Sequence, residues 1–166
     1  MRAPRRLDPQ LAAEHLPRLY RAARAWTRTR EEAEDVVQET FAHVLARPRF
    51  IRGEGELAYL LRALRNTLTS QRRAEGRRPA TAPLMEESAI GARSSDDPAE
   101  AAEIREVHDA VRELPQEFRD ALVAVDIAGL SYREAARALG VPEGTVTSRL
   151  FRARDRLAQR LEGDAS

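Results

Sequence analysis

Residues 131 to 161 constrain the fold most, because they specify two helices joined by a tight turn. Ser131 to Glu134 matches a capping box, in which the serine hydroxyl accepts from the Glu134 amide while the glutamate reaches back to the Ser131 amide. Gly140 permits a sharp exit from the first helix, and Pro142 suits the first turn of the next one. A capped helix, a glycine turn and a second helix together predict a helix-turn-helix.

The second helix of this motif is expected from about Pro142 to Leu161, with one apolar and one polar face. Its predicted buried residues are Val146, Leu150, Ala153, Leu157 and Leu161. Its outer faces carry Thr145, Thr147, Ser148, Arg149, Arg152, Arg154 and Arg156. Arginine can bond guanine edges with two hydrogen bonds or hold phosphates, and serine and threonine can reach either. A helix whose arginine face is merely solvated is the alternative, but the capped helix and turn before it favour DNA binding.

Three amphipathic helices are predicted in the N-terminal part of the chain. Apolar residues recur at spacings of three and four over residues 11–26 and again over 31–46, and Pro48 stops the second pattern. After a glycine turn at 53–55, a leucine stripe from Leu57 to Leu68 marks a third helix. The distal end of that helix is basic and carries Arg62, Arg65, Arg72 and Arg73. Strand patterns do not appear in the sequence.

Helical periodicity disappears between Pro79 and about Glu103, where proline, serine and acidic residues accumulate. It restarts at Ile104, and a further helix is predicted from Pro115 to a glycine stop at Gly129. We therefore expect an all-α fold of two small helical domains, at residues 1–78 and 104–166. A flexible acidic linker at 79–103 would join them, and the C-terminal domain would hold the helix-turn-helix.

The charge balance and residue usage exclude several kinds of protein. The 28 basic and 27 acidic residues leave a net charge of only +1, so nucleic-acid binding must come from charge segregation. The chain has no cysteine, which excludes disulfides, thiolate catalysis and cysteine-based zinc sites. The three histidines lack metal-ligand spacing, and no phosphate-cradling glycine loop or acid–base constellation appears, so we expect no metal, cofactor or enzymatic activity.

No stretch approaches the roughly 20 apolar residues needed to span a bilayer. We therefore expect a soluble, cytoplasmic protein without membrane insertion.

Three segments resemble the extracytoplasmic function group of bacterial sigma factors. The stretch GLSYREAARALGVPEGTVTSRLFRARDRL, residues 129–157, resembles the promoter-reading domain of that family. AEDVVQETF, residues 33–41, resembles its polymerase-binding helix, and ELAYLLRALRNTLTSQRR, residues 56–73, resembles its promoter-melting helix. The resemblance implies a region 2-like domain at 1–78 and a region 4-like domain at 104–166. It also implies a subunit that directs promoter-specific transcription initiation without covalent chemistry of its own.

The resemblance implies three sets of contact residues. The set for the minus-35 element comprises Arg133, Thr145, Thr147, Ser148, Arg149, Phe151, Arg152 and Arg154. The set for the minus-10 element comprises Asn66, Thr69, Ser70, Arg72 and Arg73. The set that faces the polymerase clamp helices comprises Asp35, Gln38 and Glu39. In the minus-10 set the Asn66 amide would read a base edge while the arginines hold phosphate; Tyr59 and Ser70 depart from the residues usual in the family.

The implied partners are core RNA polymerase, through its clamp helices and flap, and promoter DNA, and an anti-sigma factor is left open as a third. Two other functions remain. A sigma-like interaction protein could act as a decoy for an anti-sigma factor, although a decoy would not need an intact reading helix. A plain helix-turn-helix regulator could bind DNA as a dimer, but residues 33–41 and the long linker have no role in that scheme.

Overall fold

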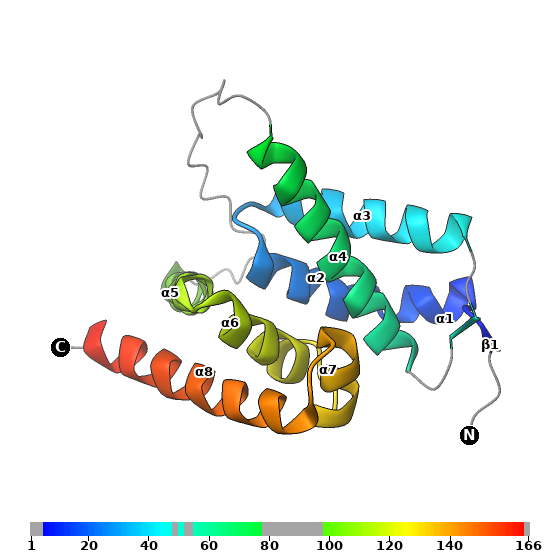
Figure 1. Cartoon of the computed structure of the whole chain (residues 1–166). Coiled ribbons are helices and arrows are strands. Elements are labelled where there is room, and N and C mark those ends of the chain that lie inside the picture. Colours follow the sequence, from blue (N-terminus) through cyan, green and yellow to red (C-terminus); the bar gives the residue numbers. More distant parts are fainter. Residues whose placement is uncertain (1–4, 48–49, 52–54, 78–97, 165–166) are drawn as a thin grey trace.

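The computed structural model describes residues 5–47, 50–51, 55–77 and 98–164, and nearly all of their regular structure is helical (Figure 1). The all-α prediction is therefore confirmed. The exception among these residues is one short antiparallel pairing of strand β1, Arg5–Arg6, with strand β2, Phe50–Ile51. It ties the start of the described chain to the segment between the second and third predicted helices.

The described residues of the N-terminal half form four helices where the sequence predicted three. These are α1 Pro9–Glu14, α2 Leu16–Trp26, α3 Arg30–Ala46 and α4 Glu56–Gly76. The predicted helix over 11–26 is broken at His15, and Pro17 lies in the first turn of α2. Proline has no amide hydrogen and is tolerated there because first-turn amides have no intrahelical partner. Because the apolar spacing continues across His15, the sequence pattern does not reveal the break.

The core of this half is formed mainly where α2, α3 and α4 pack together. Its largest fully buried side chains are Trp26, Leu19, Leu60, Leu61, Leu64 and Val36. The leucine stripe predicted for the third helix is thus the buried face of α4. The opposite side of α4 is left for polar residues.

The C-terminal half contains helices α5 Pro98–Glu113, α6 Gln116–Leu122, α7 Tyr132–Leu139 and α8 Glu143–Asp164. Helix α5 begins before Ile104, so residues 98–103 of the predicted linker are helical. Residues 79–97 of that linker lie outside the described residues. The prediction that this segment is flexible therefore remains a prediction.

The helix predicted from Pro115 to Gly129 is present but changes type along its length. After α6 the chain forms a π-helical turn, η1, at Val123–Ile127, in which the Ala128 amide bonds the Val123 carbonyl at 2.8 Å. Gly129 then adopts φ +77°, a left-handed conformation that favours glycine and ends the element.

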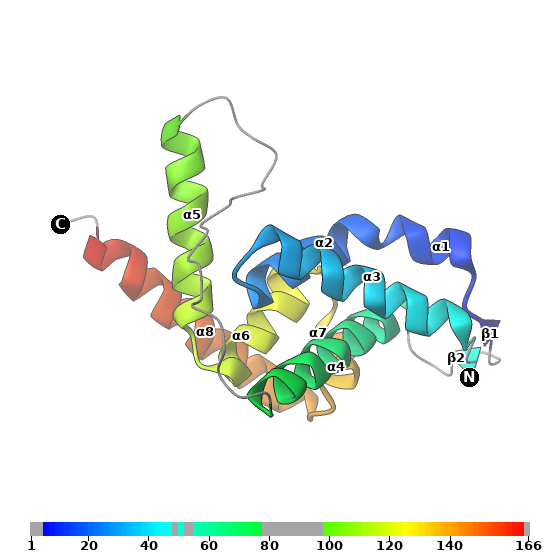
Figure 2. The same ribbon diagram turned by 90° about the horizontal axis from the view of Figure 1, so that it is seen from above.

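The two halves are packed against each other. Contacts join α4 to α7, α2 to η1 and α2 to α5, and buried side chains from both halves form one continuous cluster. Seen from above, α1 and α3 lie to one side, α5 and the C-terminal end of α8 extend to the other, and α7 lies behind α4 (Figure 2). The first half of α5 projects away from the N-terminal helices.

Candidate nucleic-acid interface

The helix-turn-helix predicted from the capping box is present as α7, a turn and α8. The Glu134 amide donates to Ser131 Oγ at 3.3 Å, and the Ser131 amide donates back to Glu134 Oε2 at 2.9 Å. Gly140 adopts φ +68°, and the Val141 amide bonds the carbonyl of Ala136 at 3.0 Å, as in a Schellman ending. These local interactions fix where α7 begins and ends. They therefore set the direction in which α8 leaves the turn.

Helix α8 buries the face that the sequence predicted. Val146, Leu150 and Ala153 are at most 1% exposed, and Leu157 is half-buried. The buried face packs against α6 and α7. Of the predicted minus-35 set, Arg133, Thr147, Ser148, Phe151, Arg152 and Arg154 are exposed, and Thr145 and Arg149 are half-buried.

Among the described residues, Phe151 is the most exposed of the large apolar side chains, at 73%. Arg152 beside it makes no hydrogen bond or ion pair within the part of the chain that the structure describes. An exposed apolar ring and an unengaged guanidinium on the open part of α8 suit a thymine methyl group and a guanine edge.

Two other arginines of the minus-35 set are engaged within the protein. Arg149 donates to Glu117 of α6 at 3.1 Å. Arg154 donates two hydrogen bonds to Asp126 of η1, at 3.0 and 2.7 Å, and this bonding raises the pKa of Arg154. The bidentate arrangement fixes the plane of the guanidinium. Sequence reasoning missed both acids, because they lie on α6 and η1 and only the fold brings them beside α8.

The predicted minus-10 residues are all exposed on α4, but they fall on two stripes of that helix. Asn66, Thr69, Ser70 and Arg73 are spaced as neighbours on one face. Arg72 instead follows Arg65 and Leu68, on the face that turns toward α6. The stripe of Asn66, Thr69, Ser70 and Arg73 is open, whereas the stripe that carries Arg65 and Arg72 makes contacts within the protein.

Two nitrogens of the Arg72 guanidinium donate hydrogen bonds within the protein. One nitrogen donates to the main-chain carbonyl of Trp26 at the end of α2, and another donates to Gln116 Oε1 of α6 at 3.4 Å. The structure thus brings Asn66, Thr69, Ser70 and Arg73 together on an open surface and holds Arg72 apart from them.

The three predicted polymerase-facing residues, Asp35, Gln38 and Glu39, are exposed on one side of α3. Glu39 accepts a hydrogen bond from Gln71 of α4. Gln71 was not predicted as a functional residue, although it lies between Ser70 and Arg72 in the sequence. It links the predicted polymerase surface to the predicted promoter-melting helix.

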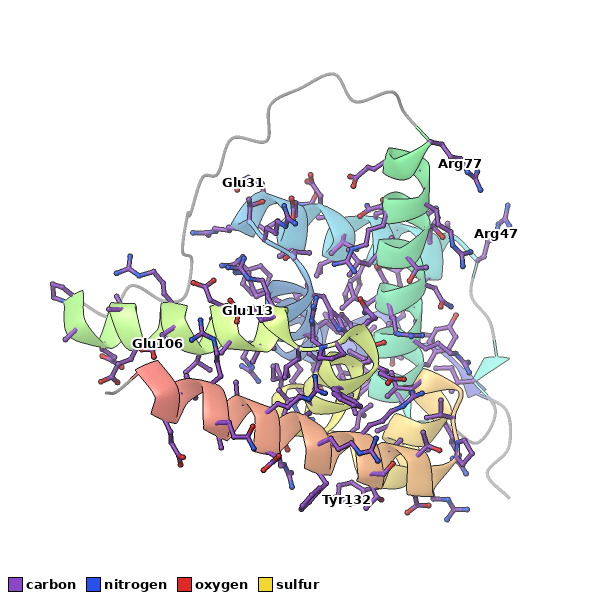
Figure 3. The ribbon with its side chains drawn as sticks, turned by 60° about the vertical axis from the view of Figure 1, so that its left-hand side comes forward. Glu31, Arg47, Arg77, Glu106, Glu113 and Tyr132 are labelled. Carbon is purple, nitrogen blue, oxygen red and sulfur yellow. The ribbon has the colours of Figure 1, made fainter. Side chains whose placement is uncertain are left out.

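Figure 3 shows where α4 ends and where α7 begins. Arg77 lies at the C-terminal end of α4, and Tyr132 lies at the start of α7 near the opposite end of the molecule. Within the described ranges, no cluster of three or more side chains that could hold a metal ion is present.

The described helices include none long and apolar enough to cross a membrane.

Family models match both halves of the chain. The model for Sigma-70 region 2 matches residues 11–78, and the model for Sigma-70 region 4 matches residues 104–157. The second match includes α7, the turn and α8 as far as Leu157. Helices α3 and α4, which carry the other two predicted sets, lie within the first.

Relatives and solved structures match most of the chain. The ECF RNA polymerase sigma factor SigM of Mycobacterium tuberculosis is 38% identical over 92% of this chain and 76% of its own length. The RNA polymerase sigma-H factor of Pseudomonas aeruginosa is 33% identical over 80% of this chain and 74% of its own length.

The structure of the sigma factor RpoE from Bartonella quintana, in complex with the anti-sigma factor NepR, superposes with a TM-score of 0.71. That alignment has 27% identity and covers 92% of this chain and 95% of RpoE. CnrH, solved with the cytosolic domain of CnrY, gives a TM-score of 0.68 at 28% identity over 93% and 87% of the two chains. With both halves matched in sequence and in structure, the chain belongs to the ECF family of RNA polymerase sigma factors.

Proposed function

We propose that this protein binds core RNA polymerase and directs transcription initiation at a limited set of promoters. The observation that carries the proposal is the open face of α8, where Phe151 is 73% exposed and Arg152 has no partner among the described residues. That face follows a correctly capped first helix, in a chain of the sigma family. The protein would act in the cytoplasm, where the polymerase works.

The protein would contribute binding energy and no covalent chemistry. Helix α8 would enter the major groove at the minus-35 element, with Arg152 and Phe151 on base edges. The open stripe of α4, namely Asn66, Thr69, Ser70 and Arg73, would engage unpaired bases and phosphates at the minus-10 element. Core polymerase would supply the catalytic metal.

The contact with polymerase would run through Asp35, Gln38 and Glu39, whose side chains form an acidic and amide surface on α3. Such a surface is complementary to basic groups on a partner. The clamp helices and flap of the polymerase are the partners that the family resemblance implies. We also propose an anti-sigma factor as a regulatory partner, supported by the solved RpoE relative.

The domain assignment is part of the same proposal. Residues 1–78 would act as the region 2 domain and residues 104–166 as the region 4 domain, with 79–103 as the connection. The family matches at 11–78 and 104–157 support these limits. The helical start at Pro98 moves the structured beginning of the second half ahead of the proposed boundary.

The proposal is tested by adding the purified protein to core polymerase and measuring binding and promoter-dependent transcripts. Asp35→Arg with Glu39→Arg should weaken polymerase binding on the order of tenfold or more by charge reversal. The matched control is Glu103→Arg with Glu106→Arg, which makes the same charge change at exposed positions of α5.

Failure of the wild-type protein to associate with core polymerase would refute the proposal. Association without any transcript, together with binding to an anti-sigma factor, would instead identify a decoy. Specific binding to a palindromic DNA site by a dimer that ignores polymerase would identify a plain regulator.

A further inference from the structure

Two arginines of α8 are paired with acids from the elements that precede the helix-turn-helix. Arg149 donates to Glu117 Oε2 of α6 at 3.1 Å. Arg154 donates to both carboxylate oxygens of Asp126 in η1, at 3.0 and 2.7 Å. Each guanidinium therefore lies beside a carboxylate that offsets its charge.

Arg149 and Arg154 border the buried face of α8 on its two sides. At about 100° per residue, a separation of five positions leaves the two side chains about 140° apart around the helix axis. The buried Leu150 and Ala153 lie in the arc between them. Arg152 lies in the opposite, outer arc, and it makes no hydrogen bond or ion pair within the described part of the chain.

The two kinds of position would meet different parts of DNA. A helix in the major groove turns its outer arc toward the base edges and brings its flanks near the sugar-phosphate backbones on either side. Arg152 is therefore placed for base edges, whereas Arg149 and Arg154 are placed for phosphates. The two acids thus compensate the phosphate-facing arginines and leave the base-facing arginine charged.

This distribution of charge affects the part of DNA affinity that is independent of sequence. Each phosphate neutralised by a protein cation releases counterions and adds about 0.9 to the slope of log K against log salt. An arginine held by a carboxylate brings a negative charge to the same phosphate, so the pair contributes little net attraction. Weak binding of this kind matters because a genome offers roughly a million or more competing sites.

We propose that Glu117 and Asp126 restrain the phosphate-facing arginines of α8 and thereby keep sequence-independent DNA binding weak. The inference rests on the proposed function, in which α8 enters the major groove. It gives two acids outside the predicted contact sets a role in the choice between partners. The free protein then stays available to polymerase instead of being distributed over chromosomal DNA.

Removing either carboxylate releases the charge of its arginine. Asp126→Asn and Glu117→Gln keep the size of the side chain, and each should bind a random-sequence duplex about threefold to tenfold more tightly at low salt. Each should also steepen the slope of log K against log salt by about one unit. Asp126→Asn should have the larger effect, because the Arg154 side chain is 52% exposed and that of Arg149 is 28% exposed.

Glu34→Gln is the matched control, because it also removes one negative charge from an ion pair. Arg30 donates to Glu34 at 2.7 Å on α3, in the N-terminal half, and the two side chains are 56% and 42% exposed. The net charge rises by one, as in the other two variants, but no arginine of α8 is released. The affinity for the random-sequence duplex should therefore stay within about twofold of wild type.

A double variant shows whether Asp126 acts through its arginine. With Arg154→Ala in place, Asp126→Asn has no guanidinium to release and should give no gain over Arg154→Ala alone. A gain that needs Arg154 identifies restraint of that side chain. A gain that does not need it identifies direct repulsion between Asp126 and DNA.

The assay titrates the full-length protein, without polymerase, against a fluorescently labelled random-sequence duplex at a series of salt concentrations. Anisotropy reports binding, and urea unfolding reports whether each variant is folded. Three results would overturn the inference: no gain for the folded variants, an equal gain for Glu34→Gln, or a gain from Asp126→Asn that persists without Arg154. If Asp126→Asn fails to fold, Glu117→Gln, alone and with Arg149→Ala, gives the same test.

A second measurement separates this inference from the proposed function. Bound to core polymerase, Asp126→Asn should keep the differences in affinity among single-base minus-35 mutants, because an added phosphate contact is the same for every sequence. Loss of those differences would mean that Asp126 supports base reading, and would overturn the restraint. If the wild-type protein fails to bind polymerase, the proposed function fails, while the titration with random-sequence DNA still decides the role of the two acids.

Discussion

Replacing Arg152 with alanine is the sharpest test of base reading by α8. Arg152 is exposed and makes no hydrogen bond or ion pair in the described part of the chain, so its removal should leave folding stability nearly unchanged. A bidentate contact to a base pair contributes about 1–3 kcal/mol of discrimination. We therefore expect Arg152→Ala to weaken binding to the correct minus-35 sequence by about 5-fold to 150-fold.

The matched comparison is Arg156→Ala, one helical turn farther along α8. The Arg156 guanidinium lies 5.1 Å from the ring centre of Phe118, and the side chain is exposed. We assign it to phosphate contact. Its removal should weaken binding to every sequence alike and lower the slope of log K against log salt by about one unit.

The assay uses the full-length protein bound to core polymerase. Both variants are titrated against the correct minus-35 sequence and a panel of single-base mutants at two salt concentrations. Arg152→Ala should flatten the differences among the sequences, whereas Arg156→Ala should preserve them. If Arg152→Ala weakens all sequences by the same factor, the assignment of that side chain to base reading is wrong.

Four further predictions follow from local geometry. Arg154→Ala breaks a partly exposed ion pair and should cost about 0.2–1 kcal/mol of folding stability in urea unfolding, with base preference unchanged. Ser131→Ala removes the cap of α7 and should cost about 1 kcal/mol by the same measurement. Leu150→Ala opens a cavity at a side chain that is 1% exposed and should cost about 2–5 kcal/mol. Burial, Arg24 and Arg112 together lower the pKa of His108 below 6.5. The folded state favours neutral His108, so its contribution to folding stability should be complete above pH 6.5 and lost as the pH falls through the lowered pKa. His108→Asn should therefore make the free energy of unfolding less dependent on pH between these two values, as measured by unfolding curves at a series of pH values.

The helix-turn-helix could be predicted in detail because its signals are local. The capping box, the left-handed Gly140 and the buried face of α8 depend on residues only a few positions apart. Such patterns can be read without knowing the rest of the fold. The same holds for the leucine stripe of α4.

Features that depend on more distant residues, or on one local break, were missed. The continuous apolar spacing over 11–26 outweighed the signal of Pro17, although proline in the first turn marks a helix start. The π-helical turn at Val123–Ile127 keeps an apolar pattern that periodicity cannot distinguish from an α-helix.

The engagement of the predicted arginines could not be read from the sequence either. Arg72 was assigned to DNA from its position, and nothing nearby in the chain points to Gln116 of α6. The pairing of Arg65 with Asp120 spans 55 positions. Such contacts arise only from the packing of the two halves, which no local pattern specifies.

The π-helical turn determines how the chain can absorb a change of length just before the helix-turn-helix. A π turn holds one more residue between bonded groups than an α turn. Deleting one residue of Val123–Ile127 can therefore be absorbed by a return to α-helical bonding, and the chain after it keeps nearly the same direction. A deletion in a segment that stays α-helical, such as Gln116–Leu122, instead rotates the residues after it by about 100°. Single-residue deletions should therefore disturb the placement of α7 and α8 less within η1 than within α6.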